Sequence, residues 1–304
     1  MHMSSWELRP LARENCPGYQ LPASDDKAGR RGTRIQVRDQ DSFDAALDLQ
    51  PGTTVASVFP DKFAPAGAAP AEAAEDLDLD LDIDTDADTV MSNTSPAPST
   101  APLKPVAVLN LASEYHPGGG WEKGALAQEE ALCYRSSLYL SLHRSYYPFH
   151  MEGGIYTPTC LLIRDALSRG HALLHPNVPL ADLPITSIIT VAALRRPEID
   201  ERGCFARPRD REYTKAKIRG VLRMAVVRGH SKIVLGALGC GAFGNPPEEV
   251  ADCFVEVFEE EEFRGGWFED IVFAVLDNAK PGKGGEDGIG NYGVFFRALN
   301  GLIV

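Results

Sequence analysis

The chain has 304 residues, of which 44% are hydrophobic and 24% charged, and its formal net charge is −13. This is enough apolar material for one large domain or two small ones, but no apolar run is long enough to cross a bilayer. The first residues lack the basic flank and apolar core of a secretion signal, and the six cysteines include no Cys-x-x-Cys pair. We therefore expect reduced thiols, no metal site, no membrane association, no secretion, and a nuclear or cytoplasmic location.

The N-terminal part of the chain has the pattern of a short, ordered segment. The pattern predicts a helix over Trp6–Asn15, a strand over Arg34–Val37, a helix over Asp41–Leu49 and a strand over Thr54–Phe59. Residues 1–62 are too few to be stable alone. We expect them to form an accessory segment that packs on the later domain as its first layer.

The next segment, residues 63–104, is strongly acidic. Residues 63–103 contain nine acidic residues and no Lys or Arg, while the rest of the chain is close to neutral. Its composition predicts a solvated, disordered insert, and the alternative is an acidic-hydrophobic docking segment for a basic partner. The near-neutral charge of the rest of the chain argues against direct binding of duplex nucleic acid and favours a small or protein-attached ligand. We also expect a monomer.

Residues 105–304 alternate strands with helices and are predicted to form the core domain. The predicted strands are Val106–Ser113, Ile155–Ile163, Ser187–Ala193, Lys232–Leu238 and Asp270–Asp277, and the clearest helices are Ala127–Tyr146, Asp210–Gly229 and Pro247–Phe263. Strands that are apolar on both faces and separated by helices indicate an α/β sheet covered on both sides. In such sheets, function gathers at the carboxyl ends of the strands.

One motif follows the first of these strands. Gly118, Gly119 and Gly120 lie where the strand ends, and after seven further residues Gln128, Glu129 and Glu130 open a helix. Consecutive glycines suit a loop whose backbone a ligand approaches closely. Acidic residues in a first helical turn also have a structural explanation, because they interact favourably with the helix dipole. Adjacent helical residues point about 100° apart, so Glu129 and Glu130 cannot have the same role.

A second glycine-rich loop, Gly239–Asn245, lies between a strand and the helix that starts near Pro247. A helix N-terminus with proline in its first turn presents backbone N–H groups and a positive dipole end to an anion. A diphosphate is the expected ligand, with Phe243 covering it or stacking on a ribose, and the alternative is a tight turn without a ligand. No Lys-Ser or Lys-Thr pair follows the glycines, and no acidic partner is placed for a dinucleotide, so nucleoside triphosphate binding and hydride transfer are disfavoured.

These two loops resemble those of the microbial-type poly(ADP-ribose) glycohydrolases. Further similarity lies in Asn110–Ser113, Pro117–Gly120, Ala127–Leu132, Arg135–Tyr139 and Ile155–Pro158, and it extends from about Val106 to Asp277, with a weaker part over Leu11–Pro60. The resemblance implies a macrodomain, a three-layer α/β/α fold with a mixed central sheet, which binds ADP-ribose across its strand ends and needs no cofactor.

The resemblance also implies roles for individual residues. Glu130 would be the general acid that protonates the leaving oxygen and then the base that activates water, and Glu129 would bind and orient the sugar hydroxyls. Asn110 and the Gly118–Gly120 backbone would contact the distal ribose, and Tyr156 the adenosine side. Gln128 is a further expected substrate-binding residue. The residues expected at the diphosphate are Gly239, Cys240, Gly241, Ala242, Phe243, Gly244 and Asn245.

The expected activity is hydrolysis of the ribose–ribose glycosidic bond, with poly(ADP-ribose) or ADP-ribosylated protein as substrate and ADP-ribose as product. Two alternatives stay open: a macrodomain that binds ADP-ribose without cleaving it, and a hydrolase of mono-ADP-ribosylated protein or nucleic acid. Local recognition of one diphosphate by backbone N–H groups favours action at chain ends. Trp121, Glu122 and Lys123 depart from the small or aliphatic residue usual after the glycine triplet, and they flank the expected catalytic pocket.

Overall fold

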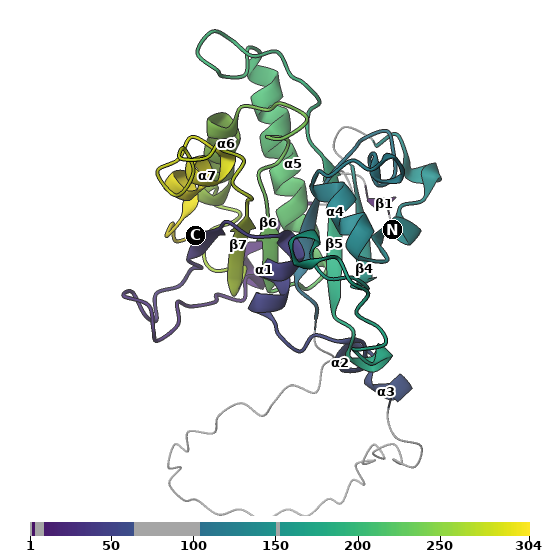
Figure 1. Cartoon of the computed structure of the whole chain (residues 1–304). Helices are drawn as coiled ribbons and strands as arrows, with labels where there is room; N and C mark the ends of the chain where they lie inside the picture. Colours follow the sequence, from purple (N-terminus) through teal and green to yellow (C-terminus); the bar gives the residue numbers. More distant parts are fainter. Residues whose placement is uncertain (1, 4–8, 64–103, 150–152) are drawn as a thin grey trace, which may run out of the picture.

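The computed structural model describes residues 2–3, 9–63, 104–149 and 153–304. The strands are β1 (His2–Met3), β2 (Ile35–Arg38), β3 (Ala107–Ala112), β4 (Gly154–Leu161), β5 (Ile185–Ala192), β6 (Lys232–Leu235) and β7 (Asp270–Ala274). The helices are α1 (Ser42–Leu49), α2 (Val55–Val58), α3 (Pro60–Phe63), α4 (Gln128–Arg135), α5 (Pro208–Val227), α6 (Pro247–Glu259) and α7 (Asn291–Leu299) (Figure 1). None of the helices in the described ranges has the length and apolar character of a membrane span.

The strands form one mixed sheet in the order β1-β4-β5-β3-β6-β7-β2. The five strands from β5 to β2 run parallel, while β4 is antiparallel to β5 and β1 is antiparallel to β4. β3 lies in the middle, and its side chains alternate between two separate apolar clusters, one on each face of the sheet. The expected α/β fold with a mixed sheet between two helical layers is therefore confirmed.

The two helical layers have different sizes. On one face, α5, α6 and α7 pack on the sheet through a cluster in which the Phe254 ring meets the Phe273 ring of β7 edge-on at 4.9 Å. On the other face, α1 and α4 contribute Phe43 and Leu132, which are both fully buried in the second cluster, where both helices contact β3. The smaller layer is thus built from one helix of the N-terminal stretch and one of the core.

The N-terminal stretch also supplies a strand to the sheet. β2 pairs in parallel with β7, with Ile35 opposite Ile271, and Arg34 bridges to Ile303 near the C-terminus. The C-terminal residues therefore lie at the β2 edge of the sheet, whereas β1 forms the opposite edge (Figure 1). The division of the chain at residues 62 and 104 stays a prediction, and the acidic tract at 64–103 lies outside the described residues.

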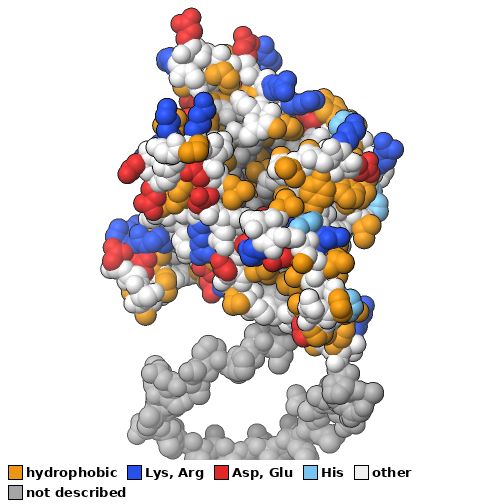
Figure 2. Space-filling model, viewed as in Figure 1, with side chains coloured by type: hydrophobic (Ala, Val, Ile, Leu, Met, Phe, Trp, Pro, Cys, Tyr) orange, Lys and Arg blue, Asp and Glu red, His pale blue; other side chains and the backbone are white. Residues whose placement is uncertain are grey.

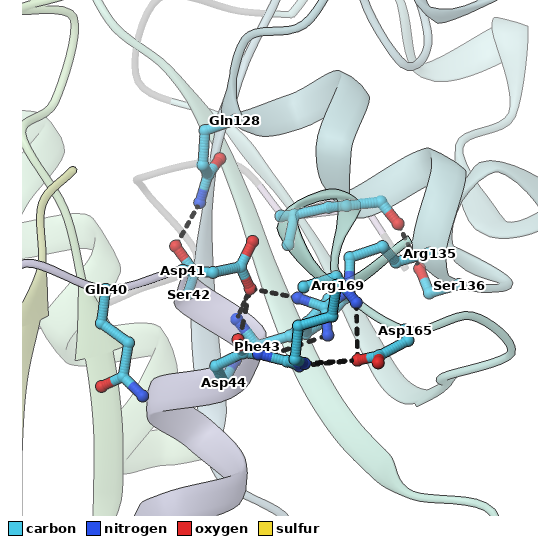
Figure 3. A network of polar contacts seen from close by, with 12 residues as sticks. Gln40, Asp41, Ser42, Phe43, Asp44, Gln128, Arg135, Ser136, Asp165 and Arg169 are labelled. Carbon is cyan, nitrogen blue, oxygen red and sulfur yellow. Dashed lines mark hydrogen bonds and ion pairs between the residues drawn. The ribbon is translucent and has the colours of Figure 1, made fainter. Parts of the chain in front are cut away.

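A buried ion-pair network joins α1 to α4 (Figure 3). Arg135, whose side chain is 2% exposed, donates to the carboxylates of Asp41 and Asp44, the latter at 2.8 Å. Arg169 reaches the other oxygen of Asp44 at 2.6 Å. Burial opposes ionisation of Asp44, but these arginines hold the pKa of its carboxyl below the ordinary value. Asp41 also caps α1 by accepting from two of its backbone N–H groups.

Three sequence predictions require correction. The predicted strand Thr54–Phe59 is the short helix α2, because Thr54 and Ser57 exchange side-chain-to-backbone hydrogen bonds in a capping box. The helix predicted over Ala127–Tyr146 ends at Arg135 and continues as two short 3₁₀ turns. The helix predicted over Trp6–Asn15 lies partly outside the described residues, and its described end is a single 3₁₀ turn.

The end of α4 has a specific cause. The Ser136 hydroxyl donates to the Leu132 carbonyl and accepts from the Leu138 N–H, which replaces the next helical hydrogen bonds. The chain then bridges to Leu162 beside β4. A β-sheet contact thus stops a helix that the apolar periodicity alone would extend.

We predict that Asp41→Ala lowers the free energy of unfolding by about 3 kcal/mol, because it removes a helix cap and leaves the buried Arg135 with one carboxylate fewer. Asp41→Asn keeps an oxygen for the cap and separates the two effects. Asp48→Ala, at an exposed position of the same helix, is the control and should change stability by less than about 0.5 kcal/mol. Urea unfolding measures all three, and equal effects of Asp41→Ala and Asp48→Ala would contradict the prediction.

Candidate active site

The site forms where two central strands part. β3 pairs with β6 only at Ala107 and Val108, so the later backbone groups of β3 face a gap on that side. The Gln128 side-chain amide fills the gap, since its nitrogen donates to the Leu109 carbonyl at 2.8 Å and its oxygen accepts from the Leu111 N–H at 2.9 Å. The amide also donates to Ser42 of α1 at 3.2 Å. Gln128 thereby fixes the start of α4 against β3 and α1.

The two glutamates after Gln128 are both buried, but they bond to different loops. Glu130 accepts from the Gly120 N–H at 2.7 Å, and Glu129 accepts from the Ser113 N–H at 2.7 Å. Their exposed fractions are 7% for Glu130 and 3% for Glu129. The carboxylates therefore hold the glycine loop and the end of β3 in fixed positions.

Glu129 is held in a strongly perturbed environment. Burial, and to a lesser degree the charge of Glu130, raises the pKa of Glu129 to about 8, although the Ser113 N–H and the Asn110 amide act in the opposite direction. The Oε1 atom of Glu129 is buried and accepts or donates no hydrogen bond among the described residues. Glu129 therefore keeps its proton at neutral pH.

Two positions of the glycine triplet need glycine both because their φ angles are positive and because a side chain would collide with neighbouring residues. Gly119 has φ +62°, and a Cβ on it would lie 2.3 Å from the Glu130 Oε1 atom. Gly118 has φ +69°, and its Cβ would lie 2.7 Å from the Trp121 ring. No side chain fits at either position without displacing Glu130 or Trp121.

The second loop, Gly239–Asn245, is closed by its own last residue. Asn245 donates to the Gly239 carbonyl from its backbone N–H at 3.0 Å, and its side-chain amide donates to the Leu194 carbonyl at 2.6 Å. A Cβ on Gly239 would lie 2.4 Å from that amide. The loop leads into α6, whose first residue is Pro247, so a helix N-terminus lies behind it as the sequence analysis expected.

Two adjoining cavities lie over the strand ends, and Figure 2 shows this face of the molecule hollowed there. The smaller, about 150 Å³, is bounded by the second glycine loop and by Gln128 and Glu129. The larger, about 520 Å³, is bounded by Trp121, Tyr139 and Arg144. Four residues line both cavities: Ser113, Gly119, Glu130 and Phe243. Glu130 thus stands where the two cavities meet.

Most of the expected site residues lie together at these cavities. The residues that line one or both are Gly119, Gly120, Gln128, Glu129, Glu130, Gly239, Gly241, Ala242 and Phe243. Gly118, Cys240 and Gly244 belong to the same loops but do not line a cavity. Cys240 is buried, and burial raises the pKa of its thiol well above the ordinary value, which does not suit a nucleophile.

Three expected substrate contacts are placed differently. Asn110 is fully buried beside Glu129 and lines neither cavity. Asn245 is 3% exposed, and its amide is used within the protein. Tyr156 is buried on β4, and its hydroxyl lies 2.8 Å from His230, which in turn contacts the Pro105 carbonyl just before β3. Tyr156 therefore packs in the core cluster that contains α5 residues and lines neither cavity, and its expected place on the adenosine side stays a prediction.

Several residues of the larger cavity were not predicted as site residues from the sequence, namely Ser113, His116, Tyr139, Arg144 and Arg195. Arg195 lies three residues after the end of β5, so the rule that sites lie at the carboxyl ends of strands was a usable signal. Tyr139 and Arg144 lie on 3₁₀ turns that were predicted as helix, and no signal in the sequence placed them at the cavity. In the described ranges, no group of three His, Cys, Asp or Glu residues is arranged to hold a metal ion.

The Glu129 environment predicts a pH dependence of stability. Between about pH 4.5 and pH 8 the folded state holds a proton on Glu129 that the unfolded state releases, so this residue makes folding less favourable as pH rises through that window. Glu129→Gln keeps the acceptor for Ser113 and removes the titration. We expect the variant to gain stability relative to the parent protein from pH 5 to pH 8, measured by urea unfolding. A pH-independent difference would contradict this environment for Glu129.

Comparisons with known proteins agree with the geometry. The family model "Microbial-type PARG, catalytic domain" matches residues 11–165, where PARG stands for poly(ADP-ribose) glycohydrolase. No curated protein sequence matches the chain. The poly(ADP-ribose) glycohydrolase of Thermomonospora curvata is 27% identical, with 98% of this chain and 85% of that chain covered and a TM-score of 0.63.

A second similar structure is the Deinococcus radiodurans enzyme in complex with ADP-ribose, which is 25% identical with a TM-score of 0.63 over 99% of this chain and 94% of that chain. The T. curvata enzyme bound to the inhibitor ADP-HPD is 28% identical, with a TM-score of 0.58 over 88% of this chain and 79% of that chain. The macrodomain-type fold expected from the sequence is thus shared with solved glycohydrolases. The chain belongs to the microbial-type poly(ADP-ribose) glycohydrolase family.

Proposed function

We propose that this chain hydrolyses the ribose–ribose O-glycosidic bond of poly(ADP-ribose) and releases ADP-ribose from chain ends. The observation that carries the proposal is the position of Glu130, which lines both cavities and is held by the Gly120 N–H. A bond that crosses from one cavity to the other would pass this carboxyl group. The ADP-ribose bound by the D. radiodurans enzyme supports the choice of ligand.

The proposed chemistry uses Glu130 twice. Its protonated carboxyl group gives a proton to the leaving oxygen as the bond to the anomeric carbon breaks, and an oxocarbenium-like transition state forms. The carboxylate then takes a proton from the water that attacks the same carbon, which restores the acid. The ADP-ribose diphosphate, held by the Gly239–Asn245 loop and the N-terminus of α6, places negative charge near the developing positive charge.

Glu129 acts beside Glu130 as an orienting group. With its pKa near 8, it carries a proton that can be donated to a sugar oxygen. Asn110 supports this role from behind, because its amide lies next to the Glu129 carboxyl. In this proposal Asn110 positions Glu129 and does not touch the sugar.

The main alternative is a module that binds ADP-ribose without cleaving it. Such a module needs the glycine loops but gains nothing from a carboxylate set between two cavities. One assay separates the alternatives: the protein is incubated with poly(ADP-ribosyl)ated and mono(ADP-ribosyl)ated targets that carry label. We expect loss of polymer label as free ADP-ribose; label retained on both targets would support the binding module, and release from mono-ADP-ribosylated targets alone would support the other hydrolase.

Glu130→Gln tests the proposed acid. The amide oxygen still accepts from the Gly120 N–H, so the loop keeps its support, but the side chain cannot transfer a proton. We expect polymer turnover to fall by about a hundredfold to ten-thousandfold, while calorimetry shows nearly unchanged ADP-ribose affinity. Ordinary turnover in this variant would sink the assignment.

Gly119→Ala tests the placement of Glu130 without changing its chemistry. The added Cβ would collide with the Glu130 Oε1 atom, so we expect turnover to fall by about a hundredfold because the carboxyl group is displaced. Gly124→Ala is a matched control, since Gly124 also has positive φ but no atom within 4 Å of its would-be Cβ. The control should lose only the stability that the positive φ costs an alanine, and it should keep its turnover. Equal turnover losses in the two variants would show that backbone strain, and not Glu130, is responsible.

A further inference from the structure

A tyrosine close to the two glutamates takes no part in the chemistry described so far. Tyr147 directly follows the second 3₁₀ turn after α4, and its hydroxyl group is buried without a hydrogen-bond partner among the described residues. The charge of Glu129 acts on this hydroxyl, as does the Cys133 thiol. A buried hydroxyl that lacks a partner costs stability, so its place beside Glu129 points to a function.

The position of Tyr147 is fixed by packing and by the backbone around it. Its ring lies 4.5 Å from the Phe149 ring, and both pack on the apolar cluster of the smaller helical layer. The Phe149 N–H donates to the Glu114 carbonyl at 3.0 Å. Glu114 follows Ser113, whose N–H is bonded to Glu129. The loop that holds Glu129 therefore also holds the segment that carries Tyr147.

The two oxygens of Glu129 have different surroundings. Oε2 accepts from the Ser113 N–H and lies on the side of Gly119, a residue that lines both cavities. Oε1 is buried without a partner. The Asn110 amide and the Tyr147 hydroxyl lie near this carboxyl group, line neither cavity and can both donate a hydrogen bond. A carboxyl group whose inner oxygen accepts such a bond carries its proton on the outer oxygen.

We propose that Tyr147 is a positioning residue, whose hydroxyl donates to the Oε1 atom of Glu129 when a ribose is bound. The bond leaves the proton of Glu129 on Oε2, where it faces the sugar. Hydrogen bonds at active sites commonly tighten when the ligand binds. This inference rests on the proposed function, because it gives Tyr147 a place in the same reaction. Tyr147 acts through Glu129 and does not touch the sugar.

Among the described residues, the titratable groups that act on Glu129 are Glu130 and Cys133 of the same helix and Tyr147, while β3 contributes the uncharged Asn110. Burial raises the pKa of the Cys133 thiol and of the Tyr147 hydroxyl well above their ordinary values, so both keep their protons up to pH 9.5. Ionisation of Glu129 near pH 8 turns the acceptor of the proposed bond from neutral to charged. The bond should therefore strengthen as pH rises.

The test measures ADP-ribose affinity, which requires no turnover. Calorimetry compares the parent protein with Tyr147→Phe from pH 6.5 to pH 9.5. We expect the ratio of the two affinities to rise by about fivefold across this range, because a hydrogen bond to a carboxylate is the stronger one. The variant keeps the ring and loses a hydroxyl without a partner, so its thermal unfolding temperature should not fall. Its polymer turnover should fall by about tenfold.

Two control variants separate the proposed role from a structural one. In a Glu129→Gln background the acceptor does not titrate, so the effect of Tyr147→Phe on affinity should be the same at every pH. Tyr134→Phe removes another hydroxyl of the same layer, which donates to the Trp121 carbonyl at 2.6 Å. Any loss of affinity that this variant causes should also be independent of pH.

A constant affinity ratio for Tyr147→Phe in the parent protein would overturn the proposal. The same pH dependence in the Glu129→Gln background would overturn it as well, because Tyr147 would then act on another group. Both outcomes concern binding and not hydrolysis. A protein that shows the expected ratio but never cleaves polymer would therefore refute the hydrolase and keep the contact of Tyr147 with Glu129.

Discussion

The side-chain amide of Gln128 makes hydrogen bonds to β3 that a neighbouring strand would otherwise make. Beyond Val108, β3 has lost β6 as a neighbour, and its backbone groups at Leu109 and Leu111 would each cost about 1–3 kcal/mol if they were buried without partners. The amide satisfies both while taking far less room than a strand. The space that it leaves becomes the cleft, and the two residues that follow it along α4 are Glu129 and Glu130. The positions of Glu129 and Glu130 therefore depend on the hydrogen bonds that Gln128 makes in place of a strand.

The N-terminal stretch is part of the site's support, although it lies far from it in sequence. The Ser42 hydroxyl accepts from the Gln128 amide at the start of α4, and the Asp41 carboxylate accepts from Arg135 at its end. Two adjacent residues at the start of α1 therefore hold both ends of α4. These partners are 86 and 94 residues apart in the chain. The family match over residues 11–165 includes both helices. A helix of two turns is thereby fixed by more than its own hydrogen bonds.

Much of this arrangement was predictable, because strands buried on both faces and glycine loops at strand ends leave clear patterns. What was not predictable depends on register and on local hydrogen bonds. From the sequence, Gln128 beside two glutamates was predicted to be a substrate contact. Only the short β3–β6 pairing shows that the Gln128 amide instead bonds to the free backbone groups of β3. Tyr156 lies in a motif that resembles the family, but the alternation along β4 sends its ring into the core. Arg144 and Tyr139 reach the cleft because Ser136 ends α4 early.

Two hydrogen bonds join the loop after β5 to the loop after β6. Asn245 bonds to the Leu194 carbonyl, and the Arg196 N–H donates to the Phe243 carbonyl at 2.7 Å. The two loops therefore support each other through hydrogen bonds, and a change of length in one would break its bonds to the other. Across relatives with this connection, insertions in the two loops should occur together, so that the shape of the cleft evolves as a unit.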